Sequence, residues 1–502
     1  MILSCQNLSK TFVDHPILKQ ASFQLEEHEK AAIVGVNGAG KTTLLKMIIG
    51  QLPADEGLIT FAKDKTFGYL AQQSDLSSSH TIYEELLSVK QDLVSMEQQL
   101  RDLEESMKHC EGTQLEEIMD RYTRMTHDFE VKGGLLYKSE LTGVLKGLSF
   151  LDEDFDKQIS TLSGGQKTRV SLAKLLLQSP DLIILDEPTN HLDIASISWL
   201  ETYLRSYKGA VLIVSHDRYF LDRIVTKVIA IENGLVRSYA GNYSDYAAKA
   251  AMLRKAAVNA YLKQQEEIHH QQQVIDKLKS FNREKSIKRA ESREKMLDKM
   301  ELLEKPVEIR DDMHLKLTPQ IISGNDVLSI EDLSKHFGSL TLFEHVDIEI
   351  KRGEHVAIIG DNGTGKTTLL KIINELESMD SGQIRLGSKV EIGYYDQEHH
   401  VLHSEKTLFD EISDDYPALT NTQIRNTLAA FLFTGDDVFK KISELSGGER
   451  GRVSLAKLML SNANFLILDE PTNHLDITSK EILEQALNDY EGTVLYLSLI
   501  HI

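Results

Sequence analysis

The fold is decided by GVNGAGKTTLLKMI at 35–48 and GDNGTGKTTLLKII at 360–373, two copies of one glycine-rich segment. Each copy follows a short apolar run and precedes an apolar-periodic stretch, which is the strand–loop–helix context of a P-loop. Glycines let backbone N–H groups wrap a phosphate, and the following helix N-terminus adds partial positive charge. We therefore predict an α/β fold with two P-loop NTPase domains.

Two further segments recur, and their spacing shows where the copies differ. LSGGQKTRVSLAKLLL at 162–177 returns as LSGGERGRVSLAKLML at 445–460, and LIILDEPTNHLDI at 182–194 returns as FLILDEPTNHLDI at 465–477. These pairs lie 283 residues apart and the P-loops 325 apart, so the first copy contains 42 additional residues. This insert, at about 84–130, has no proline and carries 5 Lys/Arg against 13 Asp/Glu. We predict that it forms an acidic helical hairpin.

A second non-repeated segment, at 241–325, separates the copies and is predicted to form a longer helical hairpin. No proline occurs from 189 to 305, which permits long helices. Steps of three and four residues predict a coiled-coil seam formed by Ala250, Leu253, Ala257, Ala260, Gln264, Ile268, Gln271, Ile275 and Leu278. The chain is expected to reverse direction at 280–282.

Residues 277–295, here called the basic tip, carry 8 Lys/Arg against 3 Asp/Glu and lie at the predicted end of this hairpin. Their charge opposes that of the whole chain, so we favour a role in neutralising RNA phosphates. A solvated charged helix face is the alternative. The candidate RNA-binding residues are Lys285, Lys288, Arg289 and Arg293.

The composition restricts the class of protein. The chain has 502 residues, 41% hydrophobic and 26% charged, with a net charge of −21. The composition is that of a globular protein, and the length suggests more than two domains. The negative net charge argues against wholesale binding to nucleic acid or anionic membrane. Two cysteines cannot build a disulfide framework and favour a reducing compartment. Because the start lacks a secretory signal and no apolar run reaches the length of a membrane span, we expect a soluble, cytoplasmic protein.

The repeated motifs carry the chemistry of nucleotide hydrolysis. Lys41 is expected to reach the β- and γ-phosphates, and the Thr42 hydroxyl is expected to bind Mg²⁺. Asp186 and Glu187 end an apolar strand, where Asp186 suits Mg²⁺ and Glu187 suits polarising the attacking water. The second copy repeats these four residues as Lys366, Thr367, Asp469 and Glu470. The remaining predicted phosphate-loop residues are Gly35, Asn37, Gly38, Gly40, Thr43, Gly360, Asn362, Gly363, Gly365 and Thr368.

The LSGGQ and LSGGE segments resemble the signature motif of ATP-binding cassette ATPases. In that family the signature of one cassette caps the γ-phosphate bound to the other, so the resemblance implies two composite sites. The site on Lys41 would be completed by the second signature, Ser446, Gly447, Gly448 and Glu449. The site on Lys366 would be completed by the first signature, Ser163, Gly164, Gly165 and Gln166. ATP would then hold the cassettes together, and hydrolysis would loosen them.

Smaller motifs extend this resemblance with less specificity. Gln72 and Gln397 match the Q-loop glutamine near Mg²⁺ and water, and His216 in VSHD matches the histidine that senses the γ-phosphate. Phe12 in LSKTF and Phe337 in LSKHF match the aromatic residue that stacks on adenine. Taken alone, each residue type is more often polar surface, core packing or a structural histidine.

The second copy departs from the first at its end. GAVLIVSHDRYFLDRI at 209–224 aligns with GTVLYLSLIHI at 492–502, so Leu499 stands opposite His216. We expect a truncation or a reading-frame accident, with a degenerate C-terminus as the alternative. The site built on Lys366 lacks the histidine, so we predict that it binds ATP more readily than it hydrolyses it.

The tandem cassettes, the arm inserted in the first, the basic-tipped linker and PTNHLD in both copies resemble the ABC-F family over essentially the whole chain. The resemblance implies a first cassette at 1–240 with its arm at about 84–130, a helical linker at 241–325 and a second, incomplete cassette at 326–502.

It also implies an ATPase that uses ATP and Mg²⁺, has no membrane domain and pairs its cassettes within one monomeric chain. Its implied partner is the ribosome, with rRNA and tRNA contacted through the linker, and its implied role is to modulate translation or to protect it from ribosome-targeting antibiotics. The alternatives are the energy-coupling ATPase subunit of an ABC transporter and a DNA-associated ABC ATPase.

Overall fold

The computed structural model describes residues 1–12, 15–71, 78–190, 192–280, 284–300, 303, 321–338, 340–360, 363–395, 402–417, 419–431, 433, 435–445, 447–461, 463–472, 475 and 477–497. The chain separates into two compact units. One comprises Met1–Tyr239 and His314–Ile502, and the other comprises Ala240–Met313. No helix in the described part of the chain is long and apolar enough to cross a membrane.

The first cassette is built on a six-stranded sheet of order β5-β6-β7-β3-β8-β9. Its strands are β3 (Lys30–Val34), β5 (Phe67–Leu70), β6 (Leu182–Asp186), β7 (Ala210–Val214), β8 (Lys227–Glu232) and β9 (Leu235–Ala240). β3, β6 and β7 run parallel and are buried throughout, as expected for strands covered on both faces. The carboxyl ends of these three strands therefore meet at one edge, where the P-loop, the acidic pair and His216 follow.

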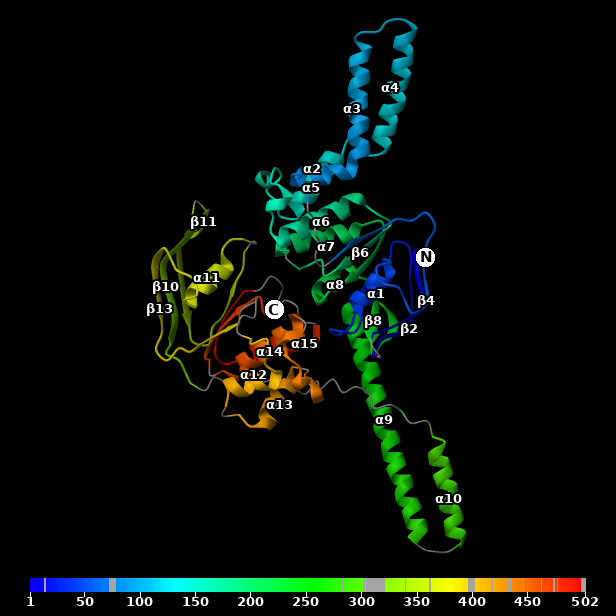
Figure 1. The fold of residues 1–502 in the computed structure, drawn as a ribbon, viewed down its shortest axis with the longest axis vertical. Helices are drawn as coiled ribbons and strands as arrows, with labels where there is room; N and C mark the ends of the chain where they lie inside the picture. The colour runs from blue at the N-terminus through cyan, green and yellow to red at the C-terminus, as the bar shows by residue number, and fades with distance from the viewer. Residues whose placement is uncertain are drawn as a thin grey trace. The chain divides into compact units, whose positions relative to one another are not determined.

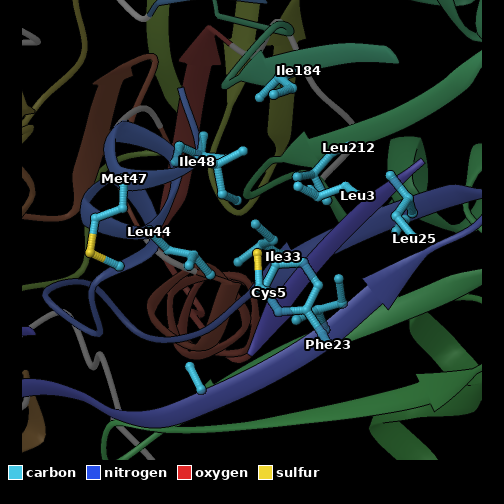
Figure 2. Close-up of a cluster of buried hydrophobic side chains, with 14 of the residues drawn as sticks. Leu3, Cys5, Phe23, Leu25, Ile33, Leu44, Met47, Ile48, Ile184 and Leu212 are labelled. Carbon is cyan, nitrogen blue, oxygen red and sulfur yellow. The ribbon is translucent and has the colours of Figure 1, made fainter. Parts of the chain in front are cut away.

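An antiparallel sheet of order β2-β1-β4 covers this core. It contains β1 (Leu3–Phe12), β2 (His15–Leu25) and β4 (Glu56–Phe61). Leu3, Cys5 and Phe23 of this sheet pack in one buried cluster with Ile33 of β3 and Leu44 of the P-loop helix α1 (Lys41–Ile48), as Figure 2 shows. Burial of this apolar cluster fixes α1, and with it the end of the P-loop that precedes the helix, against both sheets.

The remaining helices of the first cassette include the predicted acidic hairpin. α3 (Gln91–Met107) and α4 (Thr113–Val131) lie side by side (Figure 1) and share a small buried cluster with Leu93, Leu100 and Phe129. The hairpin begins at Gln91, because residues 82–87 form a separate helix, α2 (Ile82–Leu87). The other helices are α5 (Tyr137–Gly147), α6 (Gly164–Gln178), α7 (Ile194–Ser206) and α8 (Arg218–Ile224).

The second cassette repeats this plan. Its antiparallel sheet, of order β11-β10-β13, contains β10 (Asp326–Phe337), β11 (Leu340–Lys351) and β13 (Ser381–Leu386). Its parallel sheet, of order β12-β16-β15-β14, contains β12 (His355–Ile358), β14 (Ile392–Tyr395), β15 (Phe465–Asp469) and β16 (Thr493–Leu497). The helices are α11 (Lys366–Ile373), α12 (Leu408–Asp415), α13 (Asn421–Ala430), α14 (Gly447–Leu460) and α15 (Ile477–Asn488).

The second compact unit is a helical hairpin of α9 (Tyr243–Ser280) and α10 (Glu284–Asp298), drawn in green in Figure 1. Ile275 and Ala290 are fully buried between the two helices. The predicted seam is wrong over 253–260, because Leu253 is 52% exposed and Ala257 and Ala260 are exposed as well, although Ala250 is buried. α10 ends at Asp298 and is shorter than α9, so it can cover only the last part of α9, next to the turn.

Candidate nucleotide-binding site

One pocket collects most of the residues predicted for the first nucleotide site. It lies at the carboxyl ends of β3, β6 and β7, the edge at which open parallel sheets bind ligands. The predicted residues that line it are Phe12, Asn37, Gly38, Gly40, Lys41, Thr42, Thr43, Asp186, Glu187, His216, Gly447 and Gly448.

The first P-loop has the backbone geometry that its glycines permit. Gly38 and Gly40 have φ angles of 81° and 97°, and a Cβ atom on Gly40 would lie 2.5 Å from Ile17 Cγ2. α1 begins immediately after Gly40, and Lys41 Nζ donates to the carbonyl oxygens of Gly35 at 2.8 Å and Val36 at 3.1 Å. A phosphate in this loop would therefore meet both a helix N-terminus and an ammonium group.

Asp186 and Thr42 form a pair of hard oxygen donors beside the loop. Asp186 is only 3% exposed, and burial raises the pKa of its carboxyl group to about 6 although Lys41 opposes this shift. The Thr42 hydroxyl is a hydrogen-bond partner of the carboxylate. A buried carboxylate is costly unless it meets a cation, and carboxylate and hydroxyl oxygens are ligands that suit Mg²⁺.

Glu187 adopts a left-handed backbone conformation, with φ of 51°, and its side chain is only 11% exposed. Its Oε2 accepts the backbone N–H of His216 at 3.2 Å, whereas Oε1 has no hydrogen-bond partner among the described residues and lies 3.5 Å from His216 Nε2. Burial raises the pKa of this carboxyl group to about 7, and Lys480 opposes the shift. The orphaned oxygen and the near-neutral pKa suit a group that accepts a proton from water.

The two signature segments are placed differently. Gly447 and Gly448 begin α14 and line the pocket, while Ser446 lies outside the described residues. In the first signature, Ser163 Oγ accepts the Gln166 N–H at 3.3 Å, and Gln166 Oε1 accepts the Ser163 N–H at 3.0 Å. This capping box fixes the start of α6, at Gly164 and Gly165. These residues were predicted for the site on Lys366, and they do not line the pocket on Lys41.

The second P-loop repeats the local geometry of the first. Gly363 and Gly365 have φ angles of 85° and 87°, and Lys366 Nζ donates to the Gly360 carbonyl at 2.8 Å. α11 begins at Lys366, so Thr367 and Thr368 lie in its first turn. Asn362 lies outside the described residues, as do both Q-loop glutamines, Gln72 and Gln397.

The acidic pair of the second cassette also resembles the first. Asp469 is fully buried, and its Oδ1 accepts the Thr367 hydroxyl at 3.3 Å. Glu470 has φ of 48°, and its N–H donates to the Leu497 carbonyl at 3.2 Å. Phe337, at the end of β10, is 49% exposed, and Glu449 lies in the first turn of α14.

Lys480 is a pocket residue that the sequence analysis missed. It lies on α15 of the second cassette, lines the first pocket and donates to the His216 carbonyl at 3.1 Å. The repeats align Lys480 with Ile197, and this exchange of a cation for an apolar residue was the available signal. The other lining residues that were not predicted to bind ATP are Ile17, Thr189, Asn190, Val214 and Leu475.

The basic tip divides into exposed and packed cations. Lys288 and Arg289 are exposed on α10. Arg293 is half-buried, and its guanidinium donates to Gln271 Oε1 on α9, so it serves the contact between the helices. The side chain of Lys285 lies outside the description.

The comparisons with known proteins agree with this architecture. A family model described as ABC transporter matches residues 18–190 and 343–473, and a second with the same description matches 229–317. The chain is 50% identical to the putative ATP-binding protein YdiF of Bacillus subtilis (strain 168), over 99% of this chain and 77% of that protein. It is 35% identical to ABC transporter F family member 5 of Arabidopsis thaliana, over 98% of this chain and 72% of that protein.

Among solved structures, similarity extends to the complex of archaeal ribosomal stalk protein aP1 and archaeal ribosome recycling factor aABCE1. The TM-score is 0.60 at 20% identity, over 98% of this chain and 84% of that chain. At this identity the match shows a shared tandem-cassette fold.

Proposed function

The chain belongs to the ABC-F family of ATP-binding cassette ATPases, and from this premise we propose that it uses ATP to control binding to the ribosome and thereby modulates translation. The first pocket is the hydrolytic site of this proposal, and the basic tip is its RNA-binding surface. The observation that carries the proposal is that residues of both cassettes line the first pocket.

In the proposed site, Lys41 and the P-loop backbone bind the β- and γ-phosphates, and Gly447 and Gly448 contact the γ-phosphate from the other cassette. Glu187 accepts a proton from the water that attacks the γ-phosphorus, which yields ADP and phosphate. Glu187 Oε1 supports this role, because an acceptor that has no partner in the described part of the chain can orient a water molecule in the pocket.

Mg²⁺ fits the same site. Thr42 and Asp186 would hold it directly or through water, and Thr367 and Asp469 would do so in the second cassette. The bound ion would neutralise charge on the phosphates, and it would also relieve the burial cost of the Asp186 carboxylate.

The basic tip supports contact with ribosomal RNA. Lys288 and Arg289 are exposed there, in a chain whose net charge is −21. A negatively charged protein is repelled by phosphate over most of its surface, so a local cationic surface determines which part approaches RNA. The tandem-cassette fold also occurs in a protein described as a ribosome recycling factor, which is compatible with a partner of this kind.

The test is sedimentation with ribosomes in the presence of ATP. The double variant Glu187→Gln, Glu470→Gln retains the shape of both sites but loses both proposed proton acceptors, so we expect it to remain bound to ribosomes while the wild type dissociates. If this variant sediments free of ribosomes, the proposed partner is wrong.

A charge-reversal pair then locates the contact. Lys288→Glu with Arg289→Glu should abolish co-sedimentation and leave basal ATPase activity unchanged. The matched control is Lys255→Glu with Lys263→Glu, which makes the same charge change at exposed positions of α9 away from the tip. Equal losses in the two pairs would contradict a specific role for the basic tip.

A further inference from the structure

Both cassettes contain the same ionic contact behind the aromatic residue at the end of their first strand. In the first cassette, Asp55 Oδ1 lies 2.6 Å from Lys10 Nζ, and Asp55 Oδ2 accepts the Thr11 N–H at 2.8 Å. Phe12 follows at once and lines the nucleotide pocket. The backbone bond between the Asp55 N–H and the Ser9 carbonyl, at 3.0 Å, completes the contact.

The second cassette has the same aspartate and lysine in the same backbone arrangement, but Lys335 Nζ is held there by Glu377 Oε1 at 3.0 Å and by the Ser378 carbonyl at 2.5 Å. Asp380 Oδ2 accepts the His336 N–H at 2.6 Å, Asp380 Oδ1 lies 3.9 Å from Lys335 Nζ, and the Asp380 N–H donates to the Ser334 carbonyl at 3.2 Å. Each of these residues stands 325 positions after its counterpart, and Phe337 occupies the position of Phe12. The recurrence in both cassettes shows that the bond from the aspartate to the backbone belongs to the cassette plan.

The lysine of each contact also lies close to the aromatic ring. Lys10 Nζ is 5.6 Å from the centroid of the Phe12 ring, and Lys335 Nζ is 4.9 Å from that of Phe337. Both lysines are buried, at 8% and 4% exposure, whereas both rings are about half exposed. Each buried cation therefore lies behind a ring whose exposed area is available to a ligand.

We infer that Asp55 and Asp380 are positioning residues that hold the Phe12 and Phe337 rings for stacking on the adenine base. Each aspartate accepts the backbone N–H of the residue before the ring, and Asp55 also binds the lysine two residues before it, so the strand end is held beside the ring. The pKa of Asp55 is lowered chiefly by the Lys10 hydrogen bond and that of Asp380 by the His336 backbone hydrogen bond, so both stay ionised at neutral pH. This inference rests on the proposed assignment of the pocket as an ATP site.

The experiment compares ATP with inorganic triphosphate, which has the phosphates but no base. Binding is measured on the full chain carrying Lys366→Ala, so that the first site dominates. Asp55→Ala should weaken ATP binding about five- to tenfold, because the ring would no longer be held in place for the base to stack on it. Triphosphate binding should stay unchanged. The turnover rate at saturating ATP should remain equal to that of the chain that carries Lys366→Ala alone.

Three further variants make the result decisive. In a Phe12→Ala background, Asp55→Ala should add no further loss, since the ring it positions is absent. Asp55→Asn, which keeps an oxygen acceptor for the Thr11 N–H, should recover part of the ATP affinity. Glu56→Ala, at the neighbouring exposed carboxylate, should behave as the parent.

The outcomes distinguish the assignment of Phe12 as the aromatic residue that binds the base from the positioning role of Asp55. If Phe12→Ala leaves the preference for ATP over triphosphate intact, the assignment of the pocket aromatic fails. If Phe12→Ala removes that preference but Asp55→Ala does not, the positioning role alone fails. Equal losses of ATP and triphosphate in Asp55→Ala would also overturn it, because they would indicate a general structural role.

Discussion

Glu187→Gln should abolish hydrolysis and at the same time stabilise the nucleotide-free protein. Burial raises the pKa of the Glu187 carboxyl from 4.5 to about 7. The folded state therefore binds this proton more tightly than the unfolded state, and the resulting stability is lost as pH rises from the unfolded to the folded pKa. Above pH 7 the protein carries the full cost of an ionised, buried carboxylate.

The magnitude follows from the pKa difference. At 1.36 kcal/mol per pKa unit, the cost of ionisation is about 3 kcal/mol near pH 8 and about 1 kcal/mol near pH 5. Glutamine has the same shape but no charge, so Glu187→Gln should raise the free energy of unfolding by these amounts. Removal of a general base should lower the hydrolysis rate by a factor of about 100 or more.

The assay can be confined to the first cassette, because the single tryptophan of the chain, Trp199, lies on α7. Its ring packs so closely against Gly147 that a Cβ there would lie 2.1 Å from it, and its fluorescence should report unfolding of this region. Urea unfolding at the two pH values would give the pH-dependent gain, with exposed Glu56→Gln as the control. A variant that is less stable than the wild type near pH 8 would refute the reasoning.

Two further predictions concern ion pairs in the second cassette and between the cassettes. Lys457→Met should lower the free energy of unfolding by about 3–5 kcal/mol, because it leaves the fully buried Glu411 without the ammonium that lies 2.5 Å away. Chemical unfolding followed by circular dichroism measures this, and Lys440→Met, at an exposed pair, should cost less than about 1 kcal/mol. Arg218→Glu should lower steady-state phosphate release roughly fivefold, because its guanidinium lies 2.7 Å from Glu484 on α15. Adding Glu484→Arg should restore activity, and a double variant no better than the single one would contradict this.

The sequence predicted the repeated cassettes and the local geometry of their motifs, because these depend on short segments. A glycine loop between an apolar strand and a helix, or a carboxylate pair after a buried strand, requires only neighbouring residues to specify it. Gly40 with its positive φ, and Asp186 at the buried end of β6, lie where the motifs predicted.

Features that depend on where another element ends were predicted poorly. The spacing of Leu253 in α9 indicates a helix face but not the length of the helix that covers it. Arg293 counted as one more cation in the sequence, whereas its half-buried guanidinium is bound to Gln271 across the hairpin.

Contacts that join distant segments were missed altogether. The pairing of Asp55 with Lys10 joins the residue before β4 to β1, and Asp55 belongs to none of the nucleotide-binding motifs read from the sequence. Lys480 reaches a pocket whose other charged residues are more than 260 positions away in the chain. Comparing the two repeats position by position is the sequence-based route to both.

The hydrogen bond from Lys480 to the His216 carbonyl makes the two halves of the chain unequal, which two identical subunits could not be. A symmetric pair of subunits can begin a cycle at either of two equivalent centres. Ile197 stands at the position related to Lys480, so this position supplies an ammonium to the first centre and an apolar side chain in the other copy. Joining two copies in one polypeptide thus lets the two halves differ at corresponding positions, which two identical subunits cannot do.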